Sequence, residues 1–427
     1  MNHIDWSRNA NIYEVNIRQY TTEGTINGFR KHLPRLQKMA VDIIWIMPIQ
    51  PIGKKNRKGS LGSYYSIKDY KAVNKEFGTL EDFKLLVKEA HYLGMHVLLD
   101  WVANHTAWDN VWTESNPDFY QQNEQGEFVI PWDWSDVIAL NYENHEMRKS
   151  MIGAMEYWLK ETNIDGFRCD MAGMVPVDFW NEARKALDKI KPVFMLAEDE
   201  EVVELLDFAF DMNFTWEIHH LMNAIARGEK KPVEIIWKLA EQKEKYPADA
   251  YRLYFTSNHD ENSHSGSAVE RMGEATRAFA VLTYLLPGMP LIYSGQETGT
   301  DKRLEFFEKD AIDWTEIPLH DFYKTLNQLK KENNTLWNGS YGGTLVDINK
   351  QQNENLFAIS REDGEKRIIA LINMSGDDQQ FTLKNDRLSG EYNDVFLGEK
   401  VFPGIGYTFD LKPWGFIVLA TSVANKS

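Results

Sequence analysis

The chain has 427 residues, of which 43% are hydrophobic and 26% are charged, and its net charge is −17 because 64 acidic residues outnumber 47 basic ones. This length exceeds what one hydrophobic core usually supports unless the fold is a large barrel, so we expect one barrel and a small appended domain. The charge argues against binding to nucleic acid or an anionic membrane, and no apolar run approaches the roughly 18 residues of a transmembrane helix.

Short β-branched runs alternate with amphipathic helical stretches from Ile12 to Lys331. Eight strands interleaved with helices predict an α/β fold, a (β/α)8 TIM barrel whose active site lies at the carboxyl ends of the strands. A doubly wound sheet is the alternative, but no glycine-rich phosphate loop follows the first strand. The predicted strands are Ile12–Ile17, Ile43–Met47, His96–Trp101, Ile164–Cys169, Val193–Ala197, Phe208–Phe214, Arg252–Thr256 and Pro290–Tyr293, and the main helices are Ile26–Met39, Leu80–Leu93, Glu146–Lys160, Val177–Ile190, Ala268–Leu285 and Phe322–Lys331.

Two parts of the chain break this alternation. Ala103 to Asn144 is rich in Trp, Asn, Asp and Pro and is too long for an ordinary loop, so we expect a short irregular insertion over the barrel mouth after the third strand. Beyond about Leu336, short strands between Gly, Asn and Asp turns predict a C-terminal antiparallel β-sandwich. The predicted domains are a catalytic barrel over 1–102 and 145–335, an insertion over 103–144, and an all-β domain over 336–427.

The single cysteine, Cys169, excludes an intrachain disulfide and is typical of a reducing compartment. Strand alternation predicts that its side chain is a small core residue of the barrel wall. Met1 to Arg8 is polar and has no signal-peptide pattern. We therefore expect a cytoplasmic protein that binds neither nucleic acid nor a membrane, and its oligomeric state stays open.

Polar and acidic side chains stand at the ends of several predicted strands. Arg168 and Asp170 share one face of the fourth strand because side chains alternate with period two. For these two residues alone, a structural ion pair that closes the strand end is an equal alternative. Several carboxylates in register on one barrel face would be costly to hold together without a function. The segments are Asp100-Trp101-Val102-Ala103-Asn104-His105, Gly166-Phe167-Arg168-Cys169-Asp170, Met195-Leu196-Ala197-Glu198 and Asn258-His259-Asp260.

These segments resemble, in order and spacing, the signature regions of the α-amylase superfamily of glycoside hydrolases, and the resemblance covers essentially the whole chain. It implies a retaining glycosidase that cleaves α-1,4-glucosidic bonds of starch-like α-glucans or maltodextrins through a covalent glycosyl-enzyme intermediate. An α-glucosidase, oligo-1,6-glucosidase or transglycosylase would use the same site, and a non-catalytic member is a third possibility. Further matching segments are Ile12 to Arg18, Ser63 to Tyr70, Glu76 to Thr79, Leu140 to Asn144 and Gly288 to Glu297.

The resemblance implies that Asp170 is the nucleophile, Glu198 the general acid and base, and Asp260 the stabiliser of the distorted sugar. Retention requires two carboxyl groups about 5–5.5 Å apart, one ionised and one protonated. We expect Arg168 to keep Asp170 ionised. We expect acidic neighbours to help Glu198 keep its proton, and one of those neighbours, Asp199 or Glu200, to cap the next helix.

The remaining predicted site residues would bind the sugar. The resemblance places His105 and His259 on its hydroxyls, which suits imidazoles because each can donate and accept hydrogen bonds. Tyr65 would stack beneath the sugar, and Asp100 would bridge to Arg168. His264, beyond the motif, is expected to be an ordinary loop residue.

No cofactor is expected to be required, and no metal in the active site. The resemblance makes Asn104 a candidate ligand of a structural calcium, but calcium takes about six to eight oxygens and the acidic residues of the insertion show no ligand spacing. Four tryptophans of the insertion are predicted to be sugar platforms or core. The short insertion predicts an open cleft, and therefore endo-acting or maltodextrin-directed hydrolysis. The acidic residues are Asp109, Asp118, Asp133 and Asp136, and the tryptophans are Trp108, Trp112, Trp132 and Trp134.

Overall fold

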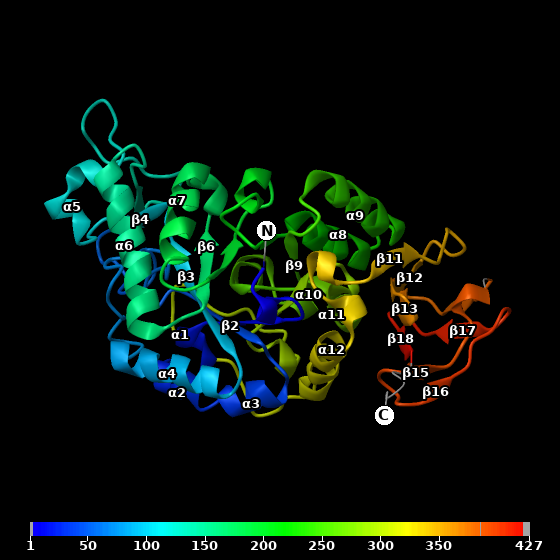
Figure 1. Cartoon of the computed structure of the whole chain (residues 1–427). Helices are drawn as coiled ribbons and strands as arrows, with labels where there is room; N and C mark the ends of the chain where they lie inside the picture. Colours follow the sequence, from blue (N-terminus) through cyan, green and yellow to red (C-terminus); the bar gives the residue numbers. More distant parts are fainter. Residues whose placement is uncertain (1–2, 385, 422–427) are drawn as a thin grey trace.

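The computed structural model describes residues 3–384 and 386–421, and at its centre eight parallel strands close into a barrel (Figure 1). Each strand pairs with its neighbours in the barrel, and the last returns to the first with Ile12 opposite Leu291. The predicted TIM barrel is therefore confirmed. The strands are β1 (Ile12–Val15), β2 (Ile43–Ile46), β3 (His96–Val102), β6 (Gly166–Asp170), β7 (Phe194–Ala197), β8 (Met212–Phe214), β9 (Tyr251–Phe255) and β10 (Met289–Tyr293).

The barrel strands are buried on both faces because successive side chains point to opposite sides of a strand. In β1, Ile12 belongs to the apolar cluster inside the barrel, whereas Tyr13 belongs to the cluster between barrel and helices. The other strands alternate in the same way, for example Leu98 inside and Leu99 outside. Burial on both faces explains why these strands appear in the sequence as continuous apolar runs.

Helices surround the barrel, and two predicted ones are interrupted. The stretch expected as one helix over Ile26–Met39 forms two helices, because a proline stands in the first turn of the second. The stretch over Ala268–Leu285 is divided at Gly273, which has a φ of 55°. The helices are α1 (Ile17–Tyr20), α2 (Ile26–Arg30), α3 (Leu33–Lys38), α4 (Leu80–Tyr92), α6 (His145–Thr162), α7 (Val177–Leu187), α8 (Trp216–Ala226), α9 (Val233–Lys245), α10 (Ala268–Met272), α11 (Thr276–Leu285) and α12 (His320–Glu332).

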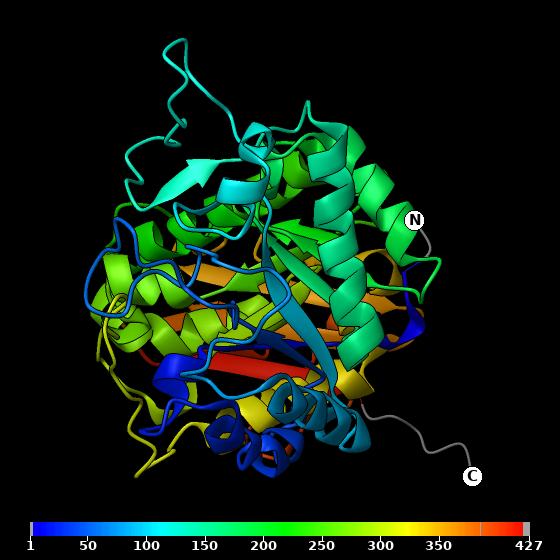
Figure 2. The same cartoon turned by 90° about the vertical axis from the view of Figure 1, so that its left-hand side faces the viewer.

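The insertion after β3 rises beyond one end of the barrel (Figure 2). It contains a two-stranded antiparallel sheet of β4 (His105–Ala107) and β5 (Val137–Ala139) and the short helix α5 (Trp112–Ser115), which the sequence pattern did not predict. The pairing of β4 with β5 joins the two ends of the insertion, so the irregular chain between them is held over the barrel mouth.

The C-terminal strands form the predicted antiparallel sandwich. A six-stranded sheet has the order β11-β12-β13-β18-β15-β16, and β14 and β17 form a second sheet. Phe381 and Phe409 of the small sheet share a core with Leu371 and Leu419 of the large one. The strands are β11 (Thr344–Asp347), β12 (Leu356–Asp363), β13 (Lys366–Asn373), β14 (Gln379–Thr382), β15 (Tyr392–Asp394), β16 (Lys400–Val401), β17 (Thr408–Leu411) and β18 (Phe416–Thr421).

A membrane-spanning helix was not expected. In the described part of the chain, no helix is both long enough and apolar enough to cross a bilayer.

Candidate active site

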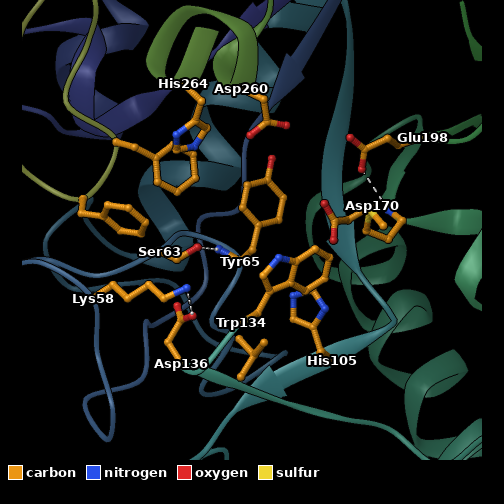
Figure 3. Close-up of a pocket in the computed structure, with 14 residues that line it drawn as sticks. Lys58, Ser63, Tyr65, His105, Trp134, Asp136, Asp170, Glu198, Asp260 and His264 are labelled. Carbon is orange, nitrogen blue, oxygen red and sulfur yellow. Dashed lines mark hydrogen bonds and ion pairs between the residues drawn. The ribbon is translucent and has the colours of Figure 1, made fainter. Parts of the chain in front are cut away.

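A cavity of about 400 Å³ opens at the carboxyl ends of the barrel strands (Figure 3). The three carboxylates to which the sequence assigns catalysis, Asp170, Glu198 and Asp260, all line it. Tyr65 and His105 line it as well. Residues from distant parts of the chain therefore meet in one pocket, as the barrel prediction required.

Strand pairing places Asp170 beside Glu198. Asp170 is the last residue of β6, and Glu198 directly follows β7, which pairs with β6 with Cys169 opposite Ala197. The backbone N–H of Glu198 donates to Cys169 O at 3.0 Å, so the hydrogen bonds between β6 and β7 continue to the residue that carries the carboxylate. Met171 has a left-handed φ of 45°, and its N–H donates to Glu198 Oε2 at 3.0 Å. Such strain at a pocket is typical of functional sites.

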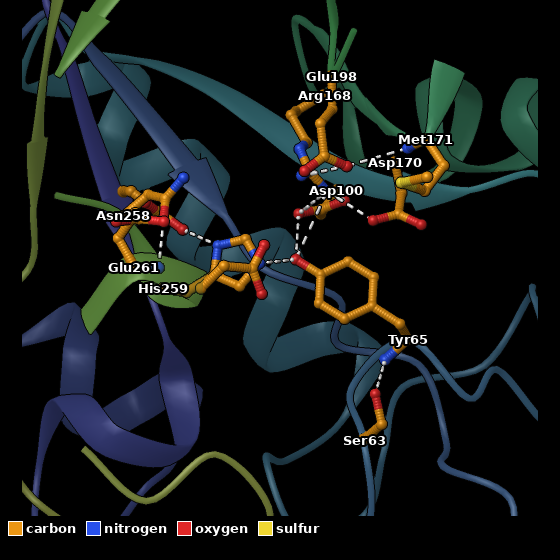
Figure 4. A network of polar contacts seen from close by, with 12 residues as sticks. Ser63, Tyr65, Asp100, Arg168, Asp170, Met171, Glu198, Asn258, His259 and Glu261 are labelled. Atoms are coloured by element: carbon orange, nitrogen blue, oxygen red, sulfur yellow. Dashed lines mark hydrogen bonds and ion pairs between the residues drawn. The ribbon is translucent and has the colours of Figure 1, made fainter. Parts of the chain in front are cut away.

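One buried guanidinium joins three carboxylates beneath the pocket (Figure 4). Arg168 Nη1 donates to Asp100 Oδ1 at 2.9 Å and to Asp170 Oδ1 at 3.1 Å. Its Nη2 lies 2.8 Å from Glu198 Oε2. Asp100 also accepts a hydrogen bond from Trp45 Nε1 at 3.0 Å. The predicted bridge from Asp100 to Arg168 is present, and it fixes the guanidinium between the two carboxylates of the pocket.

The charge state of the Asp170 and Glu198 pair differs from the sequence expectation. Arg168 contacts Asp170 as predicted, but burial and the charge of Glu198 raise the pKa of Asp170 well above its usual range. Burial also raises the pKa of Glu198, and the charge of Asp260 adds to that effect against the opposing charge of Arg168. Two ionised carboxylates are therefore unfavourable here, and the pair favours holding a proton between them.

The acidic neighbours of Glu198 serve other parts of the structure. Asp199 accepts the backbone N–H of Val202 at 2.6 Å. Glu200 accepts the N–H of Glu217 in the first turn of α8 at 2.8 Å and pairs with Arg252 at 2.8 Å. Glu200 thus caps a helix, as one of the two was expected to do. The pKa of Glu198 is raised by burial and by the charge of Asp260, rather than by these two neighbours as we expected.

His259 is a charged link between Asp260 and a carboxylate of the first strand. Its Nε2 lies 3.2 Å from Asp260 Oδ2 and 2.7 Å from the Tyr65 hydroxyl, and its Nδ1 lies 2.5 Å from Glu14 Oε1. Burial would lower the pKa of His259, but the charges of Asp260 and Glu14 raise it well above the usual value. In return, the charge of His259 overcomes the burial of Asp260 and lowers its pKa to about 2.

His105 carries no charge at neutral pH because burial lowers its pKa to about 4. Its ring meets the Trp134 ring edge-on at 5.4 Å in the wall of the pocket. Trp132 is 56% exposed, whereas Trp108 and Trp112 pack against the main core. A neutral imidazole can donate one hydrogen bond and accept another, which suits a sugar hydroxyl.

Three of the residues considered for calcium have protein partners in the structure. The Asn104 side-chain amide lies 3.2 Å from His105 Nδ1. Asp109 is paired with Lys68 at 2.9 Å and Asp136 with Lys58 at 3.1 Å, so their charges are already balanced. Over residues 3–384 and 386–421, no group of three or more His, Cys, Asp or Glu could hold a metal.

Sequence reasoning missed several residues that line the pocket or contact the polar network beneath it. Glu14 lies inside the barrel because it follows interior Ile12 by two positions, a signal that was present but not used. His264, expected to be an ordinary loop residue, lies in a π-helical turn (Glu261–Ser265) and lines the pocket. Lys58, Phe306 and Phe307 also line it, from loops in which no sequence pattern marks them.

The chain matches the family model described as "Alpha amylase, catalytic domain" over residues 7–134 and 108–335. Alpha-amylase MalA of Haloarcula japonica is 27% identical over 412 residues, covering 91% of this chain, and the chain spans 59% of the length of that relative. A solved alpha-amylase from Lactobacillus plantarum is 28% identical with a TM-score of 0.87, covering 97% of this chain and 99% of its own. A noncanonic maltogenic alpha-amylase, AmyB from Thermotoga neapolitana, is 29% identical with a TM-score of 0.87, covering 96% and 98%.

Proposed function

The chain belongs to the alpha-amylase family, and from this we propose that it is a retaining glycoside hydrolase that cleaves α-1,4-glucosidic bonds of starch-like α-glucans or maltodextrins. The observation that carries the proposal is the grouping of Asp170, Glu198 and Asp260 around one pocket, with Arg168 and His259 balancing their charges. A non-catalytic member would have no need to hold three carboxylates together around one pocket against their repulsion.

In the first half of the reaction, a carboxylate oxygen of Asp170 attacks the anomeric carbon and forms a covalent glycosyl ester. The bond from that carbon to the glycosidic oxygen breaks, and Glu198 gives its proton to the leaving oxygen. The reaction uses the state in which the shared proton lies on Glu198 and the negative charge on Asp170. Arg168 contacts both carboxylates, so it stabilises the one negative charge that the pair carries.

In the second half, Glu198 takes a proton from water, and the resulting hydroxide attacks the anomeric carbon and releases Asp170. Two inversions at this carbon retain the α configuration. A sugar hydroxyl in place of water would give transglycosylation through the same intermediate.

The surrounding side chains are proposed to hold the sugar that reacts. Asp260, kept ionised by His259, would accept hydrogen bonds from ring hydroxyls that strengthen as the sugar becomes oxocarbenium-like. His105 would bind a further hydroxyl as a neutral imidazole, and the Tyr65 ring would lie beneath the sugar. Asp100 does not reach the pocket itself; it orients Arg168 from below.

The test is a time course of products from maltoheptaose, with the anomeric form of each new reducing end followed by NMR. We expect short maltooligosaccharides that appear first as α-anomers. β-anomers would contradict retention, products longer than the substrate would show transfer, and no products would contradict the proposal. The Asp170→Asn variant serves as the control, and we expect it to fold normally and lack turnover.

A cytoplasmic location and independence from a required cofactor stay predictions. The first is supported by a single buried cysteine, Cys169. The second is supported by the pairing of two of the insertion's carboxylates, Asp109 and Asp136, with lysines.

A further inference from the structure

We propose that the pocket is closed on the side that receives the non-reducing part of the substrate, so that the protein cleaves α-glucans from their non-reducing ends. Only a short glycosyl unit would then remain on Asp170 in the covalent intermediate. This inference rests on the proposed function. The short insertion predicted an open cleft and endo-acting cleavage. We propose the opposite mode, because the residues that close the pocket lie in loops outside the insertion.

The closed side is a wall of three side chains that line the pocket, Lys58, Phe306 and Phe307. Lys58 lies in the loop between β2 and α4, and the two phenylalanines lie in the loop between β10 and α12. Phe306 and Phe307 meet edge-on at 4.9 Å. Figure 3 shows Lys58 on the side of the pocket away from Glu198, where its ammonium contacts Asp136.

The wall is fixed by contacts among its loops. The N–H of Leu61 donates to Phe307 O at 3.1 Å, and the N–H of Ser60 donates to Glu308 Oε1 at 2.7 Å. The buried Arg18 donates from Nη1 to Gly62 O at 3.0 Å. The ion pair of Lys58 with Asp136, 3.1 Å long, ties the same loop to the insertion. Three segments that are distant in sequence therefore brace one another at this end of the pocket.

The chemistry of the site determines which end of a glucan meets the wall. Glu198 protonates the leaving oxygen, so the leaving, reducing-end part of the chain lies on the Glu198 side. The sugar that bonds to Asp170 lies over Tyr65. Phe306 stacks nearly parallel to the Tyr65 ring, with centroids 6.5 Å apart and planes at 10°, so the wall stands beyond this sugar.

On the Glu198 side, Met171 is the lining residue that contacts Glu198. Met171, whose N–H contacts Glu198, is followed by Gly173 and by Met174, which is 53% exposed. A long leaving chain can therefore extend from this side, whereas the retained chain ends at the phenylalanines. Lys58 has three ammonium protons, so it can donate to a hydroxyl of the terminal sugar while it is paired with Asp136.

The test compares two maltoheptaosides with the same chromogenic group at the reducing end, one with a free non-reducing end and one with its 4- and 6-hydroxyls blocked by an acetal. We expect kcat/KM to be about 100-fold lower for the blocked substrate, because a misplaced reacting carbon loses this much rate. Equal values would overturn the closed side while leaving the proposed hydrolase intact. Cleavage of neither substrate would contradict both proposals.

A variant of the wall gives the second measurement. Phe307→Ala should lower the ratio of kcat/KM for the free substrate to kcat/KM for the blocked substrate about tenfold, mainly because the blocked substrate is cleaved faster. Phe402→Ala is the matched control, because Phe402 is 62% exposed in the C-terminal domain, and we expect it to leave the ratio unchanged. A Phe307→Ala variant that has the wild-type melting temperature and an unchanged ratio would overturn the assignment of the wall.

Discussion

At the scale of single residues, the site depends on charge balance in a buried place. Arg168 contacts Asp100, Asp170 and Glu198 at once, so one positive charge is shared among three carboxylates. His259 divides its positive charge between Asp260 and Glu14. Each carboxylate therefore has a different environment, which is how chemically similar groups take different catalytic roles.

Glu198→Gln tests the assignment of the general acid. We expect kcat/KM on maltoheptaose to fall about 1,000-fold. For a glucoside whose leaving group needs no protonation, we expect the rate of the glycosylation step to fall far less. Equal losses on both substrates would exclude Glu198 as the acid. Glu200→Gln is the control, because Glu200 caps α8 and pairs with Arg252; it should lower stability without changing the ratio between substrates.

Glu14→Gln tests how the charge of His259 is set. The substitution removes a charge that raises the pKa of His259, so that pKa falls and His259 loses its proton at a lower pH. We expect the alkaline limb of the kcat/KM profile to move to lower pH. The matched control is Glu297→Gln: Glu297 is equally buried but accepts from Tyr13 at 2.6 Å and Arg35 at 2.8 Å outside the pocket. An alkaline limb that stays in place in Glu14→Gln would contradict this role.

The catalytic candidates could be named because their segments match the family's signature regions, and the barrel pattern places these segments at the carboxyl ends of the strands. Their protonation could not be predicted, because it depends on burial that sequence neighbours do not reveal. Asp199 and Glu200 stand next to Glu198 in the chain, yet they bind backbone N–H groups elsewhere. Glu14 contacts His259 across 245 positions of sequence, a contact that only the closed barrel creates.

At the scale of secondary-structure elements, the parallel pairing of β6 with β7 determines the spacing of the reacting carboxylates. Gly166 begins β6 with a φ of 154°, and a Cβ there would lie 1.8 Å from Phe194 O of β7. No larger residue fits unless the two strands separate. Strand positions were predicted well because burial on both faces gives continuous apolar runs, whereas helix breaks at Pro34 and Gly273 depend on local geometry.

Gly166→Ala should therefore disturb the site through the strands that carry it. We expect a loss of about 2–4 kcal/mol in the free energy of unfolding and a fall in kcat of more than about tenfold. Gly153→Ala is the control: Gly153 lies inside α6, where an added Cβ would meet nothing within 4 Å, so we expect a gain of about 0.5–1 kcal/mol. Chemical denaturation followed by circular dichroism measures both changes, and wild-type activity in Gly166→Ala would contradict the account.

At the scale of the whole molecule, the C-terminal sandwich packs against the barrel through an aromatic cluster. Phe322 of α12 stacks on Phe396 with ring centroids 5.7 Å apart and contacts Phe416 at 6.2 Å. The Arg277 guanidinium lies 5.0 Å from the centre of the Phe322 ring. None of these three phenylalanines lines the pocket, so the cluster joins the sandwich to the barrel without contributing to the chemistry.

Phe322→Ala should loosen the two domains and leave the pocket unchanged. Truncation of a buried phenylalanine costs about 3–5 kcal/mol, and calorimetry should show a lower melting temperature. We expect kcat at 25 °C to stay near the wild-type value. Phe208→Ala is the control, since Phe208 is 41% exposed and should change the melting temperature little. Equal effects of the two substitutions would show that the cluster does not join the domains.

The measurement that tests the central claim most directly is the trapping of the covalent intermediate. A fluorinated α-glucosyl fluoride slows the second half-reaction more than the first, and peptide mass mapping then locates the bound sugar. We predict one glycosyl unit on the peptide that contains Asp170, and none in Asp170→Asn. A sugar on Glu198 or Asp260, or turnover of the reagent with no covalent intermediate in the wild-type protein, would contradict the assignment of Asp170 as the nucleophile.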